Sequence, residues 1–157
     1  MDGVVPVAIA LGSNLGDRRA HLAFAAERIA ALLDDLRLSP VIETEPVGVD
    51  EPQPPYLNAV VTGTTTLGAA ELLEALLDIE RERGRTRPAP RAPRTLDLDL
   101  ILYGDRVIDR DGLTVPHPRF RERRFVLEPL AELAGDWVDP VTGRTVRALL
   151  GALPPDP

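Results

Sequence analysis

Two aspartates lie two residues apart in the most regular apolar segment of the 157-residue chain, residues 96–103. Because the side chains of a strand alternate between its faces, Asp97 and Asp99 are expected to share one face, with α-carbons roughly 7 Å apart. The opposite face is expected to be apolar, formed by Leu96, Leu98, Leu100 and Leu102. Such a carboxylate pair suits Mg²⁺, which takes one or two protein carboxylates together with phosphate oxygens. On this short pattern alone, however, an ordinary strand with its polar face in water is favoured.

Arginines gather directly before this strand, at Arg85, Arg87, Arg91 and Arg94. Every basic residue of the chain is arginine, and twelve of the eighteen lie between Arg81 and Arg124, although the net charge is −7. A guanidinium binds phosphate oxygens through paired hydrogen bonds, so we expect a small, highly charged anion as ligand. A nucleic acid is not expected, because a net acidic surface repels its backbone. The open alternative is that these arginines pair with nearby carboxylates such as Glu80 and Glu82.

Hydrophobic periodicity divides the chain into strands and helices. Strands are expected at residues 4–11, 36–44, 56–66 and 96–103, and helices at about 18–33, 68–84, 123–133 and 146–153. Asp17 is expected to cap the first helix. A turn at Asp105-Arg106 is expected to lead into a short return strand, followed by a loop through residues 114–119. The order strand, helix, strand, strand, helix, strand predicts an α+β ferredoxin-like sandwich, with a mainly antiparallel sheet and helices on both sides.

Composition limits the organisation and the location of the protein. A chain of 157 residues, 44% of them hydrophobic, predicts one domain over residues 1–157 with a substantial core. The absence of cysteine excludes disulfides and thiolate metal sites. No apolar stretch approaches the roughly 20 residues that span a bilayer, and residues 4–11 lack the flanks of a signal peptide. We therefore expect a cytoplasmic protein with no membrane partner, and a monomer, since nothing requires a second subunit.

Five sequence blocks together resemble one enzyme family. Residues 93–100 (PRTLDLDL) closely resemble the signature of 6-hydroxymethyl-7,8-dihydropterin pyrophosphokinase. Residues 10–17, 56–59, 113–118 and 124–130 resemble the other blocks of that family, in its order and near its spacing. Matches spread over positions 10 to 130 argue against chance, and they shift the interpretation of the two aspartates toward a metal site.

The resemblance implies an α+β sandwich that converts ATP and 6-hydroxymethyl-7,8-dihydropterin into AMP and the pterin diphosphate, in folate synthesis. It implies that Asp97 and Asp99 hold two Mg²⁺ ions and that Arg85 and Arg94 are also catalytic. The residues that it implies on the ATP side are Glu80, Arg85, Arg87, Arg94, Thr114, His117 and Arg123. The residues that it implies on the pterin side are Thr44, Val47, Tyr56, Asn58 and Phe125.

The implied pterin residues suit a flat heteroaromatic ring. Aromatic faces such as those of Tyr56 and Phe125 can stack on it, and an amide such as Asn58 can match its hydrogen-bonding edge. The main chain of Thr44 and Val47 would contact the same edge. Core packing of the two aromatic side chains is the alternative.

Several positions leave other interpretations open. His117 lies between two prolines, so a turn-stabilising hydrogen bond is nearly as well supported as a phosphate contact. The segment from Gly12 to Asp17 is better explained as a strand-to-helix turn than as a phosphate cradle. Two positions depart from the family pattern: Arg91-Ala92-Pro93 replaces an aromatic residue followed by glycine, and Gly112 replaces an arginine.

Two other classes of function fit parts of the pattern. A ferredoxin-like RNA-binding module would need exposed aromatic residues on the sheet and a basic surface, which this sequence does not offer. A regulatory domain that binds a pterin or a nucleotide without chemistry is harder to exclude, because ring-binding residues alone would satisfy it. The paired aspartates favour the enzyme, since a sensor does not need two magnesium sites.

Overall fold

The computed structural model describes residues 3–44, 55–83 and 95–154 of the chain. Val47, Arg85, Arg87, Arg91 and Arg94 lie outside the described residues, so the predictions made for them stay predictions. The described strands are β1 (Val5–Ser13), β2 (Asp34–Leu38), β3 (Ile42–Thr44), β4 (Tyr56–Thr65), β5 (Asp97–Tyr103), β6 (Ile108–Arg110) and β7 (Leu113–Val115). The described helices are α1 (Arg18–Ala30), α2 (Ala69–Glu82), the 3-10 helix η1 (Phe120–Glu122), α3 (Arg124–Ala134) and α4 (Val146–Gly151).

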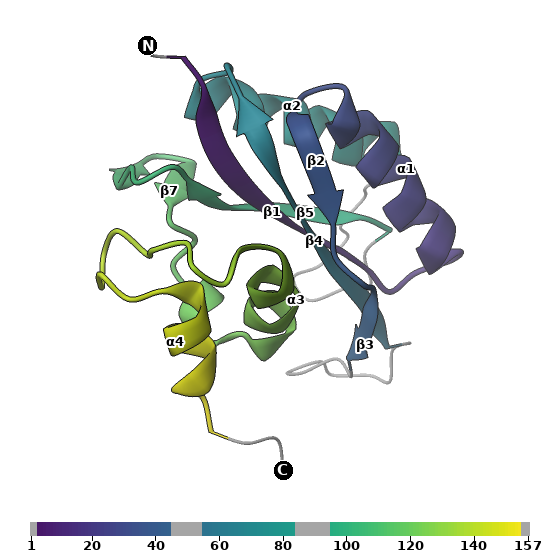
Figure 1. Cartoon of the computed structure of the whole chain (residues 1–157). Coiled ribbons are helices and arrows are strands. Elements are labelled where there is room, and N and C mark those ends of the chain that lie inside the picture. The colour runs from purple at the N-terminus through teal and green to yellow at the C-terminus, as the bar shows by residue number, and fades with distance from the viewer. Residues whose placement is uncertain (1–2, 45–54, 84–94, 155–157) are drawn as a thin grey trace.

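One antiparallel sheet forms the middle layer of the molecule. Its strands lie in the order β2, β4, β1, β5, while β3 also pairs with β4 and β6 pairs with β7 in a separate hairpin. Figure 1 shows α1 and α2 on one face of the sheet and α3 and α4 on the other. Ile9 and Leu76 belong to the buried cluster beneath α1 and α2, whereas Ala8 and Leu127 belong to the cluster beneath α3 and α4. The predicted α+β sandwich with helices on both sides is therefore confirmed.

The first two helices begin where their capping residues predict. The Asp17 carboxylate accepts a hydrogen bond of 3.1 Å from the Ala20 N–H, which satisfies one of the N–H groups that a helix start leaves without a partner. At the start of α2, the Glu71 carboxylate accepts a bond of 2.9 Å from the Gly68 N–H. These caps fix where α1 and α2 begin after the preceding strands β1 and β4.

The strand that carries the aspartates does not alternate strictly along its whole length. Leu102 lies opposite Ala8 and Leu100 lies opposite Ile9, so Ile101 is an extra residue that forms a β-bulge. One extra residue reverses the alternation of faces. Leu102 consequently packs with Ile101 beneath α3 and α4, whereas Leu98 and Leu100 pack beneath α1 and α2. The prediction that Leu102 shares a face with Leu96, Leu98 and Leu100 was wrong for this reason.

Two further boundaries differ from the expected ones. The strand expected at residues 36–44 is broken at Pro40, which has no N–H for the ladder, and β2 and β3 form on either side. Ser39 bridges the break, because its N–H donates to the Val60 carbonyl and its hydroxyl accepts from the Val60 N–H, each at 2.9 Å. The short return strand expected after a turn at Asp105-Arg106 is β6 (Ile108–Arg110), and β7 occupies part of the loop expected at 114–119.

Candidate active site

Strand register brings the paired aspartates and the amide predicted to bind pterin onto one face of the sheet. Gly12 of β1 lies opposite Asp97 of β5 on one side and opposite Asn58 of β4 on the other. Residues directly opposite each other in neighbouring strands point to the same face, so all three positions face the α3 side. Adjacent strands are about 4.8 Å apart, which places Asp97 and Asn58 about 10 Å apart with the glycine between them. The next row along the sheet holds Asp99 opposite Ala10.

Gly12 places no side chain between Asp97 and Asn58. A Cβ atom at this position would lie 3.3 Å from Asn58 Oδ1 and 3.8 Å from Tyr56 Cδ1. The Asn58 amide is fixed by its Nδ2 group, which donates a hydrogen bond of 2.8 Å to Thr44 Oγ1. Thr44, Tyr56 and Asn58 therefore lie close together beside a position that carries no side chain, and a side chain at that position would crowd Asn58 and Tyr56. The strand-to-helix turn predicted for Gly12 to Asp17 is present, since β1 ends at Ser13 and α1 begins at Arg18, and the pairing of β1 with β4 places Gly12 beside Asn58.

His117 lies next to the second aspartate. Its Nε2 atom is 4.0 Å from Asp99 Oδ1, its Nδ1 atom accepts the Arg119 N–H at 3.2 Å, and its own N–H donates to the Ile101 carbonyl at 3.0 Å. Because Nδ1 is an acceptor, the neutral ring carries its proton on Nε2, which faces the carboxylates. Burial is the main cause that lowers the pKa of His117 to about 4; the charges of Arg123 and Arg119 act in the same direction, and the Asp97 charge opposes them. At neutral pH this side chain is a neutral hydrogen-bond donor beside the aspartates.

The state of His117 can be measured by NMR. In the protein without ATP and Mg²⁺, the ring is expected to stay neutral from about pH 8 to about pH 5, because its pKa of about 4 lies below this range. The ¹⁵N signals should show a protonated Nε2 and an unprotonated Nδ1 throughout. The sequence has two histidines, so the variant His21→Gln assigns the signals. A titration of His117 centred near 6.5 would contradict the geometry described here.

Arg123 and Phe125 lie where η1 leads into α3. The Arg123 guanidinium carbon is 5.6 Å from the centre of the Phe125 ring, a distance that allows a cation–π contact. Val126 and Leu127, the next residues, are completely or almost completely buried, whereas Phe125 is only half-buried. Tyr56 is also half-buried. The protein core therefore covers only part of the Tyr56 and Phe125 side chains, and the rest of each side chain is accessible to a ligand.

The Glu80 side chain of α2 is hydrogen-bonded to β5 at Leu98, the residue between the two aspartates. Its side chain is buried, and Oε2 accepts a hydrogen bond of 2.7 Å from the Leu98 N–H. This bond holds β5 against α2 at the residue that separates Asp97 from Asp99. The structure thus shows a positioning contact for Glu80, and the ATP contact expected for it stays a prediction.

Thr114 has a different environment. It lies on the exposed side of the β6–β7 hairpin, where its hydroxyl is 3.5 Å from Asp109 Oδ1. The described contacts do not link Thr114 to the aspartates, so its predicted place on the ATP side also stays a prediction.

The acidic residues of the site fit a magnesium ion bound jointly with phosphate. In residues 3–44, 55–83 and 95–154, no group of three or more His, Cys, Asp or Glu side chains is arranged to hold a metal. Asp97 and Asp99 are both half-buried on one face, and the Asp99 side chain is 37% exposed. Mg²⁺ commonly uses one or two carboxylates and completes its shell with water and substrate phosphates. The donor set is suited to that mode of binding and not to an all-protein cage.

Sequence comparison decides the family. A model of the 7,8-dihydro-6-hydroxymethylpterin-pyrophosphokinase family matches residues 8–135. The chain belongs to this family. The family and the enzyme class predicted from the sequence are thereby confirmed, and the matched residues of this pyrophosphokinase chain include the aspartates, Gly12 and the η1 segment.

This chain is similar both to proteins of comparable length and to part of a much longer protein. The chain is 44% identical to the 2-amino-4-hydroxy-6-hydroxymethyldihydropteridine pyrophosphokinase of Synechocystis over 144 residues, which cover 90% of this chain and 73% of the relative. It is 41% identical to the protein of the same name from Pseudomonas aeruginosa, covering 94% and 91%. It is 40% identical to the folic acid synthesis protein fol1 of Pneumocystis carinii, covering 89% of this chain but only 19% of that longer protein.

Solved structures show the same fold. The wild-type HPPK-DHPS of Plasmodium falciparum, crystallised with pterin and p-hydroxybenzoate, superposes with a TM-score of 0.73 at 14% identity, covering 94% of this chain and 41% of that chain. At this identity the likeness concerns the fold alone.

Proposed function

We propose that this chain transfers a diphosphate group from ATP to the hydroxymethyl group of 6-hydroxymethyl-7,8-dihydropterin, giving AMP and the pterin diphosphate in folate synthesis. One observation carries the proposal for this family member. The register of β4, β1 and β5 places Asn58, the bare Gly12 and Asp97 in one row, with Asp99 and His117 beside it. The residues proposed to bind the ring and those proposed to bind phosphate thus lie on one face of the sheet, about 10 Å apart.

The pterin end orients the acceptor. The ring would stack between Tyr56 and Phe125 and hydrogen-bond to Asn58, beside Gly12, which carries no side chain. Orientation of this kind can remove about 7 to 11 kcal/mol of barrier, because the hydroxymethyl oxygen is held in line with the phosphorus that it attacks.

The phosphate end neutralises charge. His117 would donate from Nε2 to a phosphate oxygen, and the Arg123 guanidinium would pair with phosphate oxygens of ATP. Two Mg²⁺ ions, when held by Asp97 and Asp99, would supply charge neutralisation and a lower pKa for the hydroxyl group. Catalysis in this class of reaction is mostly positioning and electrostatic stabilisation.

In the reaction, the pterin hydroxymethyl oxygen forms a bond to the β-phosphorus of ATP. The bond from that phosphorus to the oxygen bridging it to the α-phosphorus breaks, so AMP leaves with the bridging oxygen. The hydroxyl proton passes to solvent. His117 presents a protonated Nε2 to the site, so it is not placed as a general base.

Several finer points belong to the proposal. The number of ions, the ATP contacts of Arg85, Arg87 and Arg94, and the pterin contact of Val47 come from the family resemblance. No helix in the described part of the chain is long and apolar enough to cross a membrane. The cytoplasmic location, the monomeric state and the single domain over residues 1–157 remain predictions.

A product assay tests the proposal. Purified protein incubated with ATP, Mg²⁺ and the reduced hydroxymethylpterin is expected to release AMP and pterin diphosphate in equal amounts, and chelation of the metal should stop the reaction. ADP as the nucleotide product would contradict diphosphate transfer. Binding of the pterin and ATP without AMP would instead support the regulatory domain considered above, which lacks chemistry.

A further inference from the structure

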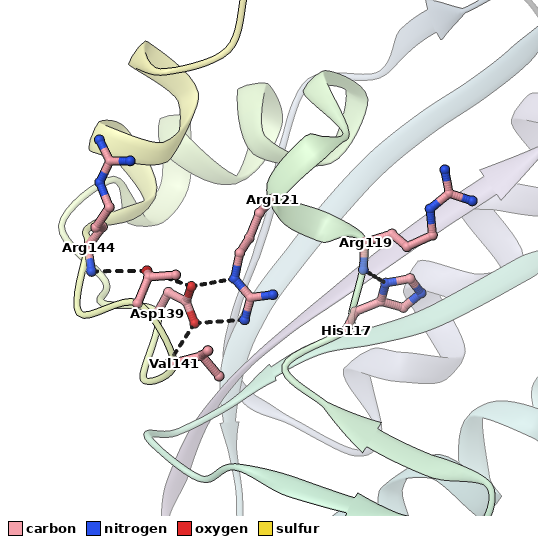
Figure 2. A network of polar contacts seen from close by, with 7 residues as sticks. His117, Arg119, Arg121, Asp139, Val141 and Arg144 are labelled. Carbon is pink, nitrogen blue, oxygen red and sulfur yellow. Dashed lines mark hydrogen bonds and ion pairs between the residues drawn. The ribbon is translucent and has the colours of Figure 1, made fainter.

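Outside the site, a buried ion pair joins η1 to the turn between α3 and α4. Asp139 is completely buried, and its carboxylate accepts from Arg121 Nε at 2.5 Å and from a terminal Arg121 nitrogen at 3.1 Å (Figure 2). The same carboxylate accepts from the Val141 N–H at 3.0 Å and from the Thr142 hydroxyl at 2.8 Å. Burial alone raises the pKa of Asp139, but the bonds from Arg121, Thr142 and Val141 hold it below its ordinary value.

The backbone of the turn that carries Asp139 is held by its own hydrogen bonds. The Asp139 N–H donates to the Arg144 carbonyl, and the Gly143 N–H donates to the Asp139 carbonyl, each at 2.8 Å. A bridge between Val138 and Thr145 closes the turn. The carboxylate is therefore held from both its backbone and its oxygens, so it offers a fixed anchor to Arg121.

Arg121 lies at the centre of the segment that carries two ATP-side residues. It is four residues after His117 and two before Arg123. Figure 2 shows Arg121 pointing toward Asp139 while His117 lies on the other side of the segment. Phe120, next to Arg121, is completely buried, and the Arg121 guanidinium carbon is 4.9 Å from its ring centre. The segment is thus attached to β5 through the His117 N–H and to the opposite side through Phe120 and Arg121.

A short 3-10 helix depends on such attachments. Its own hydrogen bonds have poor geometry, so it does not set the direction of the flanking residues by itself. A guanidinium bound through two nitrogens to one carboxylate has a single preferred orientation. The pair therefore fixes rotation of η1 as well as its distance from the α3–α4 turn.

From these contacts we infer that Arg121 and Asp139 are positioning residues, which hold η1 so that His117 and Arg123 point correctly at the phosphates of ATP. The inference rests on the proposed function, because it assigns those two residues to ATP. Both residues would act through His117 and Arg123 and not by a contact of their own with substrate. Their effect is expected on the ATP side of the reaction rather than on the pterin side, since Phe125 is held by the packing of α3.

Kinetics of Asp139→Asn test the inference. The variant keeps the side-chain shape but loses the charge that binds Arg121. It is expected to lower kcat/KM for ATP by about 10- to 100-fold, because misplacement by about 1 Å can cost that much. The KM for the pterin should change by less than about 3-fold, since the aromatic and amide contacts are intact. A rise in the KM for the pterin as large as the loss of kcat/KM for ATP would overturn the inference. So would an unchanged kcat/KM for ATP.

A matched control comes from the same region. Asp136 forms an ion pair with Arg147, but both side chains are largely exposed and neither contacts η1 in the described contacts. Asp136→Asn is expected to leave kcat and both KM values unchanged. A loss on the ATP side in this control as large as that of Asp139→Asn would show that any charge removal near α4 has the same effect, against the inference.

Further variants separate positioning from simple stabilisation. Arg121→Lys keeps the charge but not the double contact, so it should recover only part of the ATP-side loss seen with Arg121→Met. The pair Arg121→Met with Asp139→Asn removes both partners and so leaves no buried charge unpaired. If this double variant folds and regains full ATP-side activity, the pair only stabilises the fold and the inference is wrong. A persistent loss of ATP-side activity in the folded double variant supports the inference. This test remains valid if Asp139→Asn alone does not fold.

NMR gives a direct readout of position. At neutral pH the His117 ¹⁵N signals should report an unprotonated Nδ1 in the wild type, because the Arg119 N–H occupies it. In the double variant, loss of the fixed segment should produce a mixture of both tautomers. Unchanged His117 signals would overturn the inference. Failure of the proposed function is distinct, since the wild type would then form no AMP.

Discussion

Replacing Asp97 by alanine is expected to lower kcat by about 1,000-fold or more, because a preorganised group that stabilises transition-state charge contributes about this much. Asp97 and Asp99 supply the two carboxylates of the site, on one face of β5. Removing either one leaves too few ligands to hold the ions and the phosphates together. Release of AMP in the coupled reaction with ATP, Mg²⁺ and the pterin measures the effect.

The fold should survive this substitution. Asp97 is half-buried, and its loss removes repulsion between two neighbouring carboxylates. The thermal midpoint is expected to stay within a few degrees of the wild type. Asp105→Ala, which removes an exposed aspartate in the turn after the same strand, is the matched control and should keep full activity. Near-normal AMP production by Asp97→Ala would remove the metal assignment.

Replacing Gly12 by valine is expected to raise the KM for the pterin by about 10- to 100-fold, the cost of about 1 to 3 kcal/mol for disturbed hydrogen bonding and stacking. A Cβ atom alone would lie 3.3 Å from Asn58 Oδ1, and the branched methyl groups would crowd Asn58 and Tyr56 further. The KM for ATP should change little, because His117 and Arg123 lie on other elements. Steady-state kinetics with each substrate varied in turn give the comparison.

Two further variants test whether the effect on the pterin KM is specific to a larger side chain at position 12. Gly12→Ala should have a smaller effect, since a few tenths of an ångström of movement by Asn58 accommodate one methyl group. Gly151→Val is the control, because a Cβ at Gly151 meets no atom within 4 Å and the position lies at the end of α4. A Gly12→Val variant with a normal KM for the pterin and an altered KM for ATP would show that this position belongs to the nucleotide.

Local chemistry explains why much of the fold could be predicted. The Asp17 cap, the alternation of aspartates and leucines in residues 97–100, and the apolar stripe of α2 depend on neighbours a few positions away. Pro40 was visible in the sequence, yet the strand break was missed. The apolar and β-branched residues on both sides favoured one continuous strand, while the missing N–H of proline, compensated by Ser39, decided otherwise.

The bulge at Ile101 could not be predicted in the same way. A regular pattern of leucines continues through Leu102, and the extra residue becomes visible only when β5 pairs with β1. The bulge has a consequence for the site, because the Ile101 carbonyl at this point accepts the His117 N–H. Pairing between residues at least 85 positions apart in sequence (Gly12 with Asp97, 97 − 12 = 85) therefore determines where the histidine lies.

Local sequence was enough to predict the long strands, the main helices and, through five short blocks, the family. Each of these depends on local periodicity or on the identity of single residues, which a linear chain already contains. The tertiary structure alone decided that Gly12 separates Asp97 from Asn58, that His117 is neutral, and that Asp139 holds Arg121. These depend on register, burial and the approach of distant charges, quantities that exist only once the strands have paired and the helices have packed.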